Sequence, residues 1–205
     1  MAIIGAGLAG LASTKAALEY GLEPTVFERA IEPGGLWRPG SGFVWPTLTT
    51  NISRFTCVFS DHPWPRGTPD FPNAPEVAEY LLSYAHRFGV SQFIRTECDV
   101  ISLLPDGASW RVTWEHRSQK SSRLFDAVIV ASGFFAKPVM PVLPGRFDGL
   151  ALHSGSYRGA EHLRGRQAVI VGMAFSGSEI AAELAQDGML VTGVASRPFG
   201  CCRNW

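Results

Sequence analysis

Three glycines near the N-terminus constrain the fold more than any other feature of the sequence. Gly5, Gly7 and Gly10 have the spacing G-x-G-x-x-G, with a short apolar run at residues 2–4 before them and a helical pattern after them. A second apolar run follows and ends in Glu28. A strand, a glycine turn, a helix and a second strand ending in an acid are typical of a dinucleotide-binding unit. The sequence therefore predicts an α/β fold that begins with a Rossmann-like unit.

Each part of this pattern has a physical role in binding a dinucleotide. The first glycine permits the tight turn, the second lets the backbone approach a pyrophosphate, and the third lets helix and strand pack closely. Backbone N–H groups at the start of the helix, around Leu8 and Ala9, favour a bound phosphate. Glu28 lies 18 residues after Gly10 (28 − 10), where a carboxylate binds the ribose 2′-OH and repels a 2′-phosphate. We therefore expect this unit to bind FAD or NAD and not NADP; a glycine turn without a ligand is the alternative.

A second strand–turn–helix–strand pattern begins at Gln167. Gly172 and Gly177 occupy the outer glycine positions, Ala174 replaces the middle glycine, and Ser176 lies in the same turn. A methyl group at the middle position is a mild obstacle to the close approach of a phosphate. We therefore expect a second dinucleotide site that matches the pattern more loosely.

Arg197 distinguishes the second unit from the first. It lies 20 residues after Gly177 (197 − 177), where the first unit has its acid, and the segment before it carries no carboxylate. A guanidinium at this place can pair with a 2′-phosphate. The contrast between Glu28 and Arg197 predicts FAD at the first turn and NADPH at the second. The alternative for Arg197 is an ordinary solvated surface charge.

Further residues of the first unit are expected to approach its cofactor. The adjacent Gly34 and Gly35 stand before Leu36 and Trp37. Paired glycines indicate a backbone that passes very close to a neighbour such as the flavin. The alternative is a simple Pro-Gly turn.

A later apolar run, at residues 125–133, ends in Ser132 and Gly133. A continuous apolar run that ends in small residues is typical of a buried parallel strand that meets a cofactor. We therefore expect both small residues to lie at the cofactor site. The proline-rich residues 134–145 are expected to leave this strand as an extended connection over the surface.

Between these motifs the sequence predicts a loop, a helix and a meander. Residues 43–72 are rich in Pro, Thr and aromatic residues, which predicts a long irregular loop that is too aromatic to be disordered. Asn73 caps a helix whose apolar stripe packs into a core. Residues 96–104 and 109–117 flank a Pro-Asp-Gly turn and predict a β-hairpin, to which residues 123–125 add a third strand.

The composition excludes several classes of function. Hydrophobic residues make up 46% and charged residues 18%, which is ample apolar material for a core. The 18 basic and 18 acidic side chains cancel, so no general attraction to nucleic acid or to an anionic membrane is expected. The absence of a membrane-spanning run and of an N-terminal signal segment predicts a cytoplasmic protein. The four cysteines have no C-x-x-C spacing and no accompanying His cluster, so no metal site is expected.

The order of these motifs resembles that of the flavin-containing monooxygenases from residue 1 to about residue 197. The matching stretches are GAGLAG, VFE, GGLW, TTNISR, FSDHPWP, FDAVIVASG, FDGLALHSGSYR and VGMAFSG. The most specific of them is similar to the family fingerprint F-x-G-x-x-x-H-x-x-x-[YF]-[KR]. It uses Phe147, Gly149, His153, Tyr157 and Arg158. Related Baeyer–Villiger monooxygenases usually have Trp at the tyrosine place, so this fingerprint favours the N- and S-oxidising branch.

The resemblance implies a monooxygenase of the N,N-dimethylaniline type. NADPH would reduce FAD, O₂ would react at the flavin to give the C4a-hydroperoxyflavin, and one oxygen atom would pass to a soft nitrogen or sulfur nucleophile. Asn51 matches the family's active-site asparagine, whose amide can hydrogen-bond near the flavin C4a atom; a turn-forming Asn is the alternative. The fingerprint segment would join the two units, with either a structural or a chemical role for His153.

The resemblance also divides the chain into three parts. Residues 1–145 would form an FAD-binding unit with a β-meander insertion, residues 146–166 a linker, and residues 167–205 the start of an NADPH-binding unit. Because family members are more than twice as long, we expect a truncated gene product whose sheet faces are exposed, with weak cofactor retention or self-association. The alternative function is therefore a catalytically inactive nucleotide-binding fragment. A disulfide reductase would need a redox cysteine pair near the flavin, and only Cys57 is even a loose candidate.

Overall fold

A four-stranded parallel sheet organises the N-terminal part of the chain in the computed structural model, which describes residues 1–135, 137–142 and 144–196. The strand order is β3-β2-β1-β7, and every neighbouring pair runs parallel. The strands are β1 (Ala2–Ile4), β2 (Thr25–Phe27), β3 (Ile94–Arg95) and β7 (Val128–Val130).

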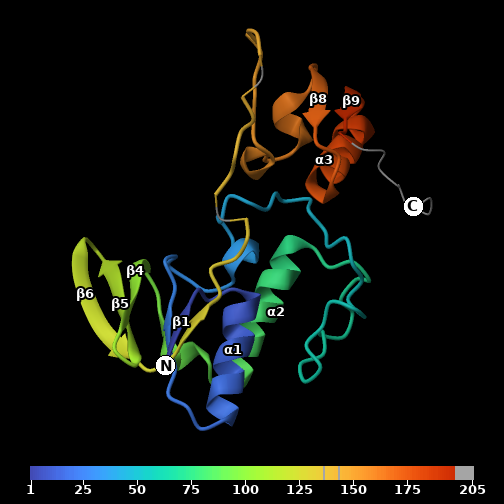
Figure 1. Ribbon diagram of the computed structural model, residues 1–205. Coiled ribbons are helices and arrows are strands. Elements are labelled where there is room, and N and C mark those ends of the chain that lie inside the picture. The colour runs from blue at the N-terminus through green and yellow to red at the C-terminus, as the bar shows by residue number, and fades with distance from the viewer. Residues whose placement is uncertain (136, 143, 197–205) are drawn as a thin grey trace.

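Two helices pack side by side next to this sheet, as Figure 1 shows: α1 (Leu8–Glu19) and α2 (Ala74–Arg87). The core between sheet and helices contains Ile3 and Val26 from the strands and Leu11 and Leu81 from the helices, all essentially inaccessible to solvent. Burial of such side chains is the main force that holds a layer of helices on a sheet. The predicted α/β fold class and the first Rossmann-like unit are thereby confirmed.

A capping box begins α2 at the predicted residue. The Asn73 side-chain oxygen accepts a hydrogen bond from the Glu76 backbone N–H at 3.0 Å, and a Glu76 carboxylate oxygen accepts one from the Asn73 N–H at 2.7 Å. Two N–H groups that the helix itself leaves unpaired are satisfied in this way. The helix ends before Gly89, whose φ of +65° is in the left-handed region.

An antiparallel meander is inserted between β3 and β7, as the sequence predicted. It consists of β4 (Cys98–Asp106), β5 (Ser109–His116) and β6 (Gln119–Phe125) in that order. The ring of Phe27 in β2 lies 4.7 Å from the Trp114 ring and 5.9 Å from the Phe125 ring, measured between centroids. These contacts join the meander to the parallel sheet through one buried aromatic residue.

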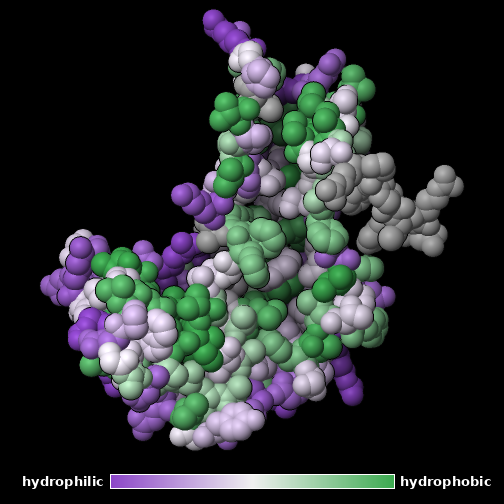
Figure 2. Space-filling model, in the orientation of Figure 1, coloured by the Kyte–Doolittle hydropathy of each residue, from purple (hydrophilic) through white to green (hydrophobic). Residues whose placement is uncertain are grey.

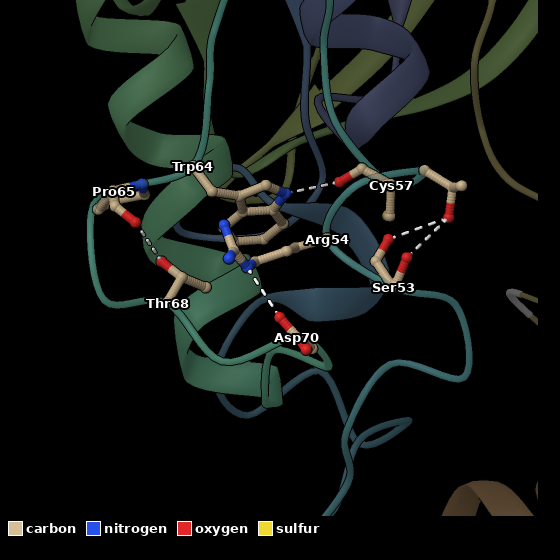
Figure 3. Close-up of polar contacts among 8 residues, drawn as sticks. Ser53, Arg54, Cys57, Trp64, Pro65, Thr68 and Asp70 are labelled. Carbon is tan, nitrogen blue, oxygen red and sulfur yellow. Dashed lines mark hydrogen bonds and ion pairs between the residues drawn. The ribbon is translucent and has the colours of Figure 1, made fainter.

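Residues 43–72 contain no helix or strand, and all of them are described. They are ordered by aromatic packing on α2: Trp64 stacks on Tyr80 at 3.9 Å, and Phe59 stacks on Tyr84 at 4.1 Å between ring centroids. Figure 3 shows two polar contacts that tie the loop to itself, the hydrogen bond from Trp64 Nε1 to the Cys57 carbonyl and the Arg54–Asp70 ion pair. The predicted irregular but ordered loop is confirmed.

A smaller unit forms the upper part of Figure 1 and consists of β8 (Gln167–Val171), α3 (Phe175–Gln186) and β9 (Leu190–Val194). The two strands pair in parallel, and one face of them is covered by Ile180 and Leu184 of α3. Short 3₁₀ turns occur in the described part of the chain at η1 (Gly35–Trp37), η2 (Ser91–Phe93), η3 (Ser154–Ser156) and η4 (Ala160–Leu163).

The expectation that residues 125–133 form a buried strand is wrong in part. The segment does form the parallel strand β7, but Val130 is 61% exposed and Val128 is only partly buried. The reason is that β7 is at the edge of the sheet, with no further strand beside it among the described residues.

Apolar side chains on the outer face of the smaller unit are exposed, as the sequence led us to expect. Val169 is 65%, Val171 59% and Leu190 65% exposed, because α3 covers only the opposite face of β8 and β9. Figure 2 shows apolar residues on the surface of both the upper and the lower parts of the molecule. No helix in the described part of the chain combines the length and the apolar character needed to cross a membrane.

Replacing the cap residue of α2 tests this account of the fold. We expect Asn73→Ala to lower the free energy of unfolding by about 1 kcal/mol, because the Glu76 N–H loses its partner. Urea denaturation followed by circular dichroism measures the loss. The control Asn73→Asp keeps an acceptor oxygen at the cap and should behave like the unchanged chain, and an unchanged midpoint for Asn73→Ala would contradict the capping role.

Candidate functional site

The first glycine turn is built on a contact that only glycine permits. A Cβ atom added to Gly10 would lie 1.9 Å from the Gly5 carbonyl oxygen, far inside any contact distance. Gly5 itself has a φ of +100°, and a Cβ there would lie 2.5 Å from the Ala131 carbonyl oxygen. The start of α1 is thus held directly against the ends of β1 and β7, which are the carboxyl ends of parallel strands. Ligands of open α/β sheets bind at such ends.

The paired glycines 34 and 35 pack on the middle of this turn. A Cβ atom on Gly35 would lie 2.9 Å from the Gly7 Cα atom, and the Gly34 N–H donates to the Ala6 carbonyl oxygen at 2.9 Å. Both have positive φ, +120° for Gly34 and +57° for Gly35. The close neighbour predicted for this pair is therefore, at least in part, the backbone of the glycine turn itself. Leu36 and Trp37, which follow Gly35 directly, begin next to the same turn.

The N-terminus of α1 is open for an anion. Gly7 is the N-cap residue, and among the described residues no side chain caps the helix and no acid stands in its first turn. Leu8, the first helical residue, is 48% exposed. Unpaired N–H groups and the positive end of the helix dipole at an accessible turn fit a phosphate. Leu8 and Ala9 thus lie at an open helix N-terminus, and their phosphate-binding role stays a prediction.

Glu28 is held at the mouth of the same turn. Its side chain is buried, with one carboxylate oxygen accepting from the Ala6 N–H at 2.8 Å and the other accepting from the Ala30 N–H at 2.9 Å. Two backbone hydrogen bonds fix the carboxylate, while each oxygen keeps a lone pair for another donor. The arrangement fits a ribose hydroxyl and disfavours a second negative charge.

Ser132 and Gly133 follow β7 into this region. A Cβ on Gly5 would lie 3.4 Å from the Ser132 Cα atom, so Ser132 borders the first glycine directly. Gly133 has a φ of +79°, which a residue with a side chain would adopt only with strain. The structure therefore gathers every residue predicted for the first cofactor site at one edge of the sheet, apart from Asn51.

Asn51 lies in an exposed turn after an anchored segment. The Thr50 N–H donates to the Pro72 carbonyl oxygen at 2.8 Å, and Thr49 forms a β-bridge with Asn73. The Asn51 side chain makes no hydrogen bond to any other described residue, so its amide is free for a ligand. Its predicted catalytic role stays a prediction.

The second turn repeats the first in detail. A Cβ on Gly177 would lie 1.9 Å from the Gly172 carbonyl oxygen, and Gly172 has a φ of +92°. Ala174 is the N-cap of α3 with φ −79° and ψ −168°, almost the angles of Gly7, which are −79° and −171°. Because these angles suit any residue, the alanine leaves the turn intact. Ser176 is exposed in the first turn of α3, and Arg197 lies outside the described residues.

The fingerprint residues lie in the segment between the two units. The His153 Nδ1 atom accepts a hydrogen bond from the Gly155 N–H at 3.0 Å and so caps η3, which is a structural role. Tyr157 is buried against α3, and burial, together with the nearby Glu183 carboxylate, raises its pKa. Phe147 is 75% exposed. Arg158 donates to the Gly155 and Tyr157 carbonyl oxygens.

Sequence reasoning missed Trp45, which lies in the same buried cluster as Tyr157. It is only 5% exposed although it lies in the irregular loop. An isolated aromatic residue without periodic neighbours carries no pattern that would reveal its partner.

Two polar contacts anchor residues 43–72, hereafter the aromatic loop, to the helices. The Lys15 ammonium on α1 lies 2.6 Å from an Asp61 carboxylate oxygen. His62 is 8% exposed, and its Nε2 atom is 2.8 Å from the Ser83 hydroxyl on α2. Burial, and secondarily the charge of Arg87, lowers the pKa of His62 below its ordinary value of 6.5, while Asp61 acts in the opposite direction.

Comparisons with known proteins agree with this geometry. Residues 1–197 match the model of a family described as flavin-binding monooxygenase-like. The chain is 35% identical to flavin-containing monooxygenase 2 of Homo sapiens and 37% identical to the N-oxide-forming dimethylaniline monooxygenase 2 of Oryctolagus cuniculus, over 93% and 91% of its length. It spans 38% of the length of each of these relatives.

Solved structures show the same likeness. The S-allyl-L-cysteine S-oxygenase of Allium sativum superposes over the whole chain with a TM-score of 0.86 and 28% identity, and 53% of that protein is covered. A flavin-containing monooxygenase of Stenotrophomonas maltophilia superposes over 96% of the chain with a TM-score of 0.84 and 26% identity, and 57% of it is covered.

Substitution by alanine should have different effects at the third glycine and at the middle glycine of the first turn. We expect Gly10→Ala to abolish cooperative folding of the first unit, because the new methyl group would overlap the Gly5 carbonyl oxygen. Gly7→Ala is the matched control: its methyl group would lie 3.4 Å from the Gly35 Cα atom and its backbone angles suit alanine. Thermal unfolding distinguishes the two, and a stable Gly10→Ala protein would refute the contact.

The anchor at His62 predicts a pH dependence of stability. Because the pKa is lowered in the folded chain, the unfolded chain binds a proton more readily below about pH 6.5, and the free energy of unfolding should fall as the pH drops from 7 to 5.5. Urea denaturation at several pH values measures this slope. His62→Gln should flatten it, whereas His86→Gln, at an exposed position on α2, should not; equal slopes in all three proteins would contradict the assignment.

Proposed function

The chain belongs to the flavin-binding monooxygenase-like family, and on that premise we propose that it carries the FAD- and NADPH-binding parts of a flavin-dependent monooxygenase. The observation that supports this most is the repeated glycine turn. In both turns a Cβ on the third position would lie 1.9 Å from the carbonyl oxygen of the first, so both helices start in the geometry that receives a dinucleotide. Residues 1–145 are the proposed FAD unit, residues 146–166 the linker and residues 167–205 the start of the NADPH unit.

FAD is proposed for the first turn. The N–H groups of Gly7, Leu8 and Ala9 would bind its pyrophosphate at the start of α1, and Glu28 would accept a hydrogen bond from the adenosine ribose. The same carboxylate would repel the 2′-phosphate of NADP. When bound, FAD supplies the redox chemistry that activates O₂.

NADPH is proposed for the second turn. The N–H groups at Ala174 and Ser176 would bind its pyrophosphate. The backbone angles of Ala174 are ordinary for an alanine, and the residue is exposed, so the turn is accessible. Arg197 is the proposed partner of the 2′-phosphate, since a guanidinium pairs well with a phosphate.

The proposed substrates are O₂ and a small molecule with a soft nitrogen or sulfur nucleophile. Support comes from two relatives, one named for N-oxide formation and one for S-oxygenation. The role proposed for Asn51 is to donate a hydrogen bond from its amide at the reacting flavin edge, for which its side chain is unengaged by other described residues.

A catalytically inactive nucleotide-binding fragment is the second candidate. The observation in its favour is the exposed apolar face of the smaller unit, where Val169, Val171 and Leu190 face solvent. Such a surface favours self-association, which is a binding role that requires no catalysis.

The visible spectrum of the purified, desalted chain tests the proposal first. A flavin band close to one per chain, followed by NADPH-dependent oxygen consumption, would support the monooxygenase. A flavin band without oxygen consumption would leave the inactive fragment. A chain that stays colourless after FAD is added would refute flavin binding.

Glu28 offers a more specific test. We expect Glu28→Gln to weaken FAD binding roughly tenfold or more, because the charged acceptor at the ribose is lost. The amide can accept from only one of the Ala6 and Ala30 N–H groups, so circular dichroism has to show that the variant is folded before its affinity is compared. Titration of apoprotein with FAD, followed by flavin fluorescence, measures the change. Glu23→Gln, an exposed carboxylate before β2, is the control. Equal affinities for both variants would exclude the ribose contact.

A further inference from the structure

A short segment of the aromatic loop supplies a core residue to the smaller unit. Trp45 is 5% exposed and lies in one cluster with Ile180 and Leu184 of α3, on the same side as the inner residues of β8 and β9. Its ring meets that of Tyr157 edge to face, with centroids 5.4 Å apart at 79°. This is a favourable geometry for two aromatic rings.

The residues just before Trp45 also contact the linker. A Cβ on Gly155 would lie 3.4 Å from the Phe43 ring, so that ring lies on the backbone of the linker. A Cβ on Gly42 would lie 3.5 Å from the guanidinium of Arg158. The segment 42–45 is therefore in contact with residues 155–158 along its length.

The other end of the segment is fixed to the first unit. The Leu48 N–H donates to the Trp45 carbonyl oxygen, which closes a turn, and the Ala74 N–H at the start of α2 donates to the Leu48 carbonyl oxygen. Thr49 and Thr50 continue the attachment through the bridge to Asn73 and the hydrogen bond to Pro72. Within five residues the chain passes from the core of one unit to the helix cap of the other.

The covalent connection between the units offers no comparable constraint. Figure 1 shows the chain after β7 running as an extended arm before it reaches η3. Its described apolar side chains are exposed, with Phe134 at 98% and Val142 at 99%, and its ion pair between Arg146 and Asp148 is local and exposed. Between described residues of the two units, no ion pair or side-chain hydrogen bond adds to the aromatic contact.

We propose that Trp45 is a positioning residue that fixes the second glycine turn relative to the first. Its functional consequence rests on the function proposed above, in which the first turn would hold FAD and the second turn NADPH, which would supply the hydride. Reacting atoms must approach to about 3–3.5 Å, and a misplacement of about 1 Å can lower a rate roughly 100-fold. Loss of the aromatic contact would leave both turns intact but release their relative position.

Cleavage of the arm tests the contact without any cofactor. Limited trypsin treatment should cut after the exposed Arg146, and the two pieces of the unchanged chain should stay together in size-exclusion chromatography. The pieces of Trp45→Ala should separate, whereas those of Trp45→Phe, which keeps a ring beside Tyr157, should not. Trp110→Ala, a partly exposed position on β5, is the control for the loss of a tryptophan. Separation in the unchanged chain, or co-elution of the Trp45→Ala pieces, would overturn the proposal.

Flavin reduction tests the consequence. In protein loaded with FAD, Trp45→Ala should keep the flavin spectrum and its reduction by dithionite, but its anaerobic reduction by NADPH should slow by roughly 10- to 100-fold. Trp45→Phe should restore most of the rate. An unchanged rate would disprove a positioning role for Trp45. If even the unchanged chain binds no flavin, the proposed function fails while the cleavage result still decides the contact. Should Trp45→Ala be insoluble, Trp45→Leu takes its place in both tests with the same expectations.

Discussion

The carbonyl oxygen of Gly5 occupies the place where a side chain of residue 10 would begin. This contact sets the distance between β1 and α1, and with it the position of the helix N-terminus at the end of the sheet. The backbone of Ala131 and Ser132, just after β7, packs against Gly5, and Gly35 packs against Gly7. The resulting glycine turn is accessible, and the buried Glu28 carboxylate is bound to its Ala6 N–H. The same contact between Gly177 and Gly172 builds the second turn, so one steric rule, applied twice, creates both candidate sites.

The first unit is stabilised by burial on several sides of its short sheet. Ile3, Leu11 and Val26 form the layer between sheet and helices, Phe27 carries the contact to the meander, and the aromatic loop covers α2 through rings stacked on Tyr80 and Tyr84. These layers allow strands of two or three residues to hold a site. Among the described residues, the smaller unit has one covered face, since α3 and the residues around Trp45 pack on the same side of β8 and β9.

Because the smaller unit has this one core, its stability depends on residues at the join between the units. The linker supplies Tyr157 and the aromatic loop supplies Trp45 to the single core of the smaller unit. The segment that carries Trp45 continues, through its attachment to the cap of α2, directly to Asn51. The fold thus connects the core of the second unit, the cap of a helix in the first and the candidate catalytic amide along one stretch of chain.

The sequence by itself determined the local elements and both glycine turns. The first site depends on spacing along one strand–helix–strand unit, which contains Gly5, Gly7, Gly10 and Glu28, and the capping box at Asn73 spans four residues. Both patterns can therefore be recognised from the local sequence alone. Only the tertiary structure decided that Trp45 packs on Tyr157, that Gly35 rests on Gly7, and that Val130 is exposed at a sheet edge. These depend on which distant surfaces meet, and an irregular loop or an edge strand has the same local sequence whether or not a neighbour covers it.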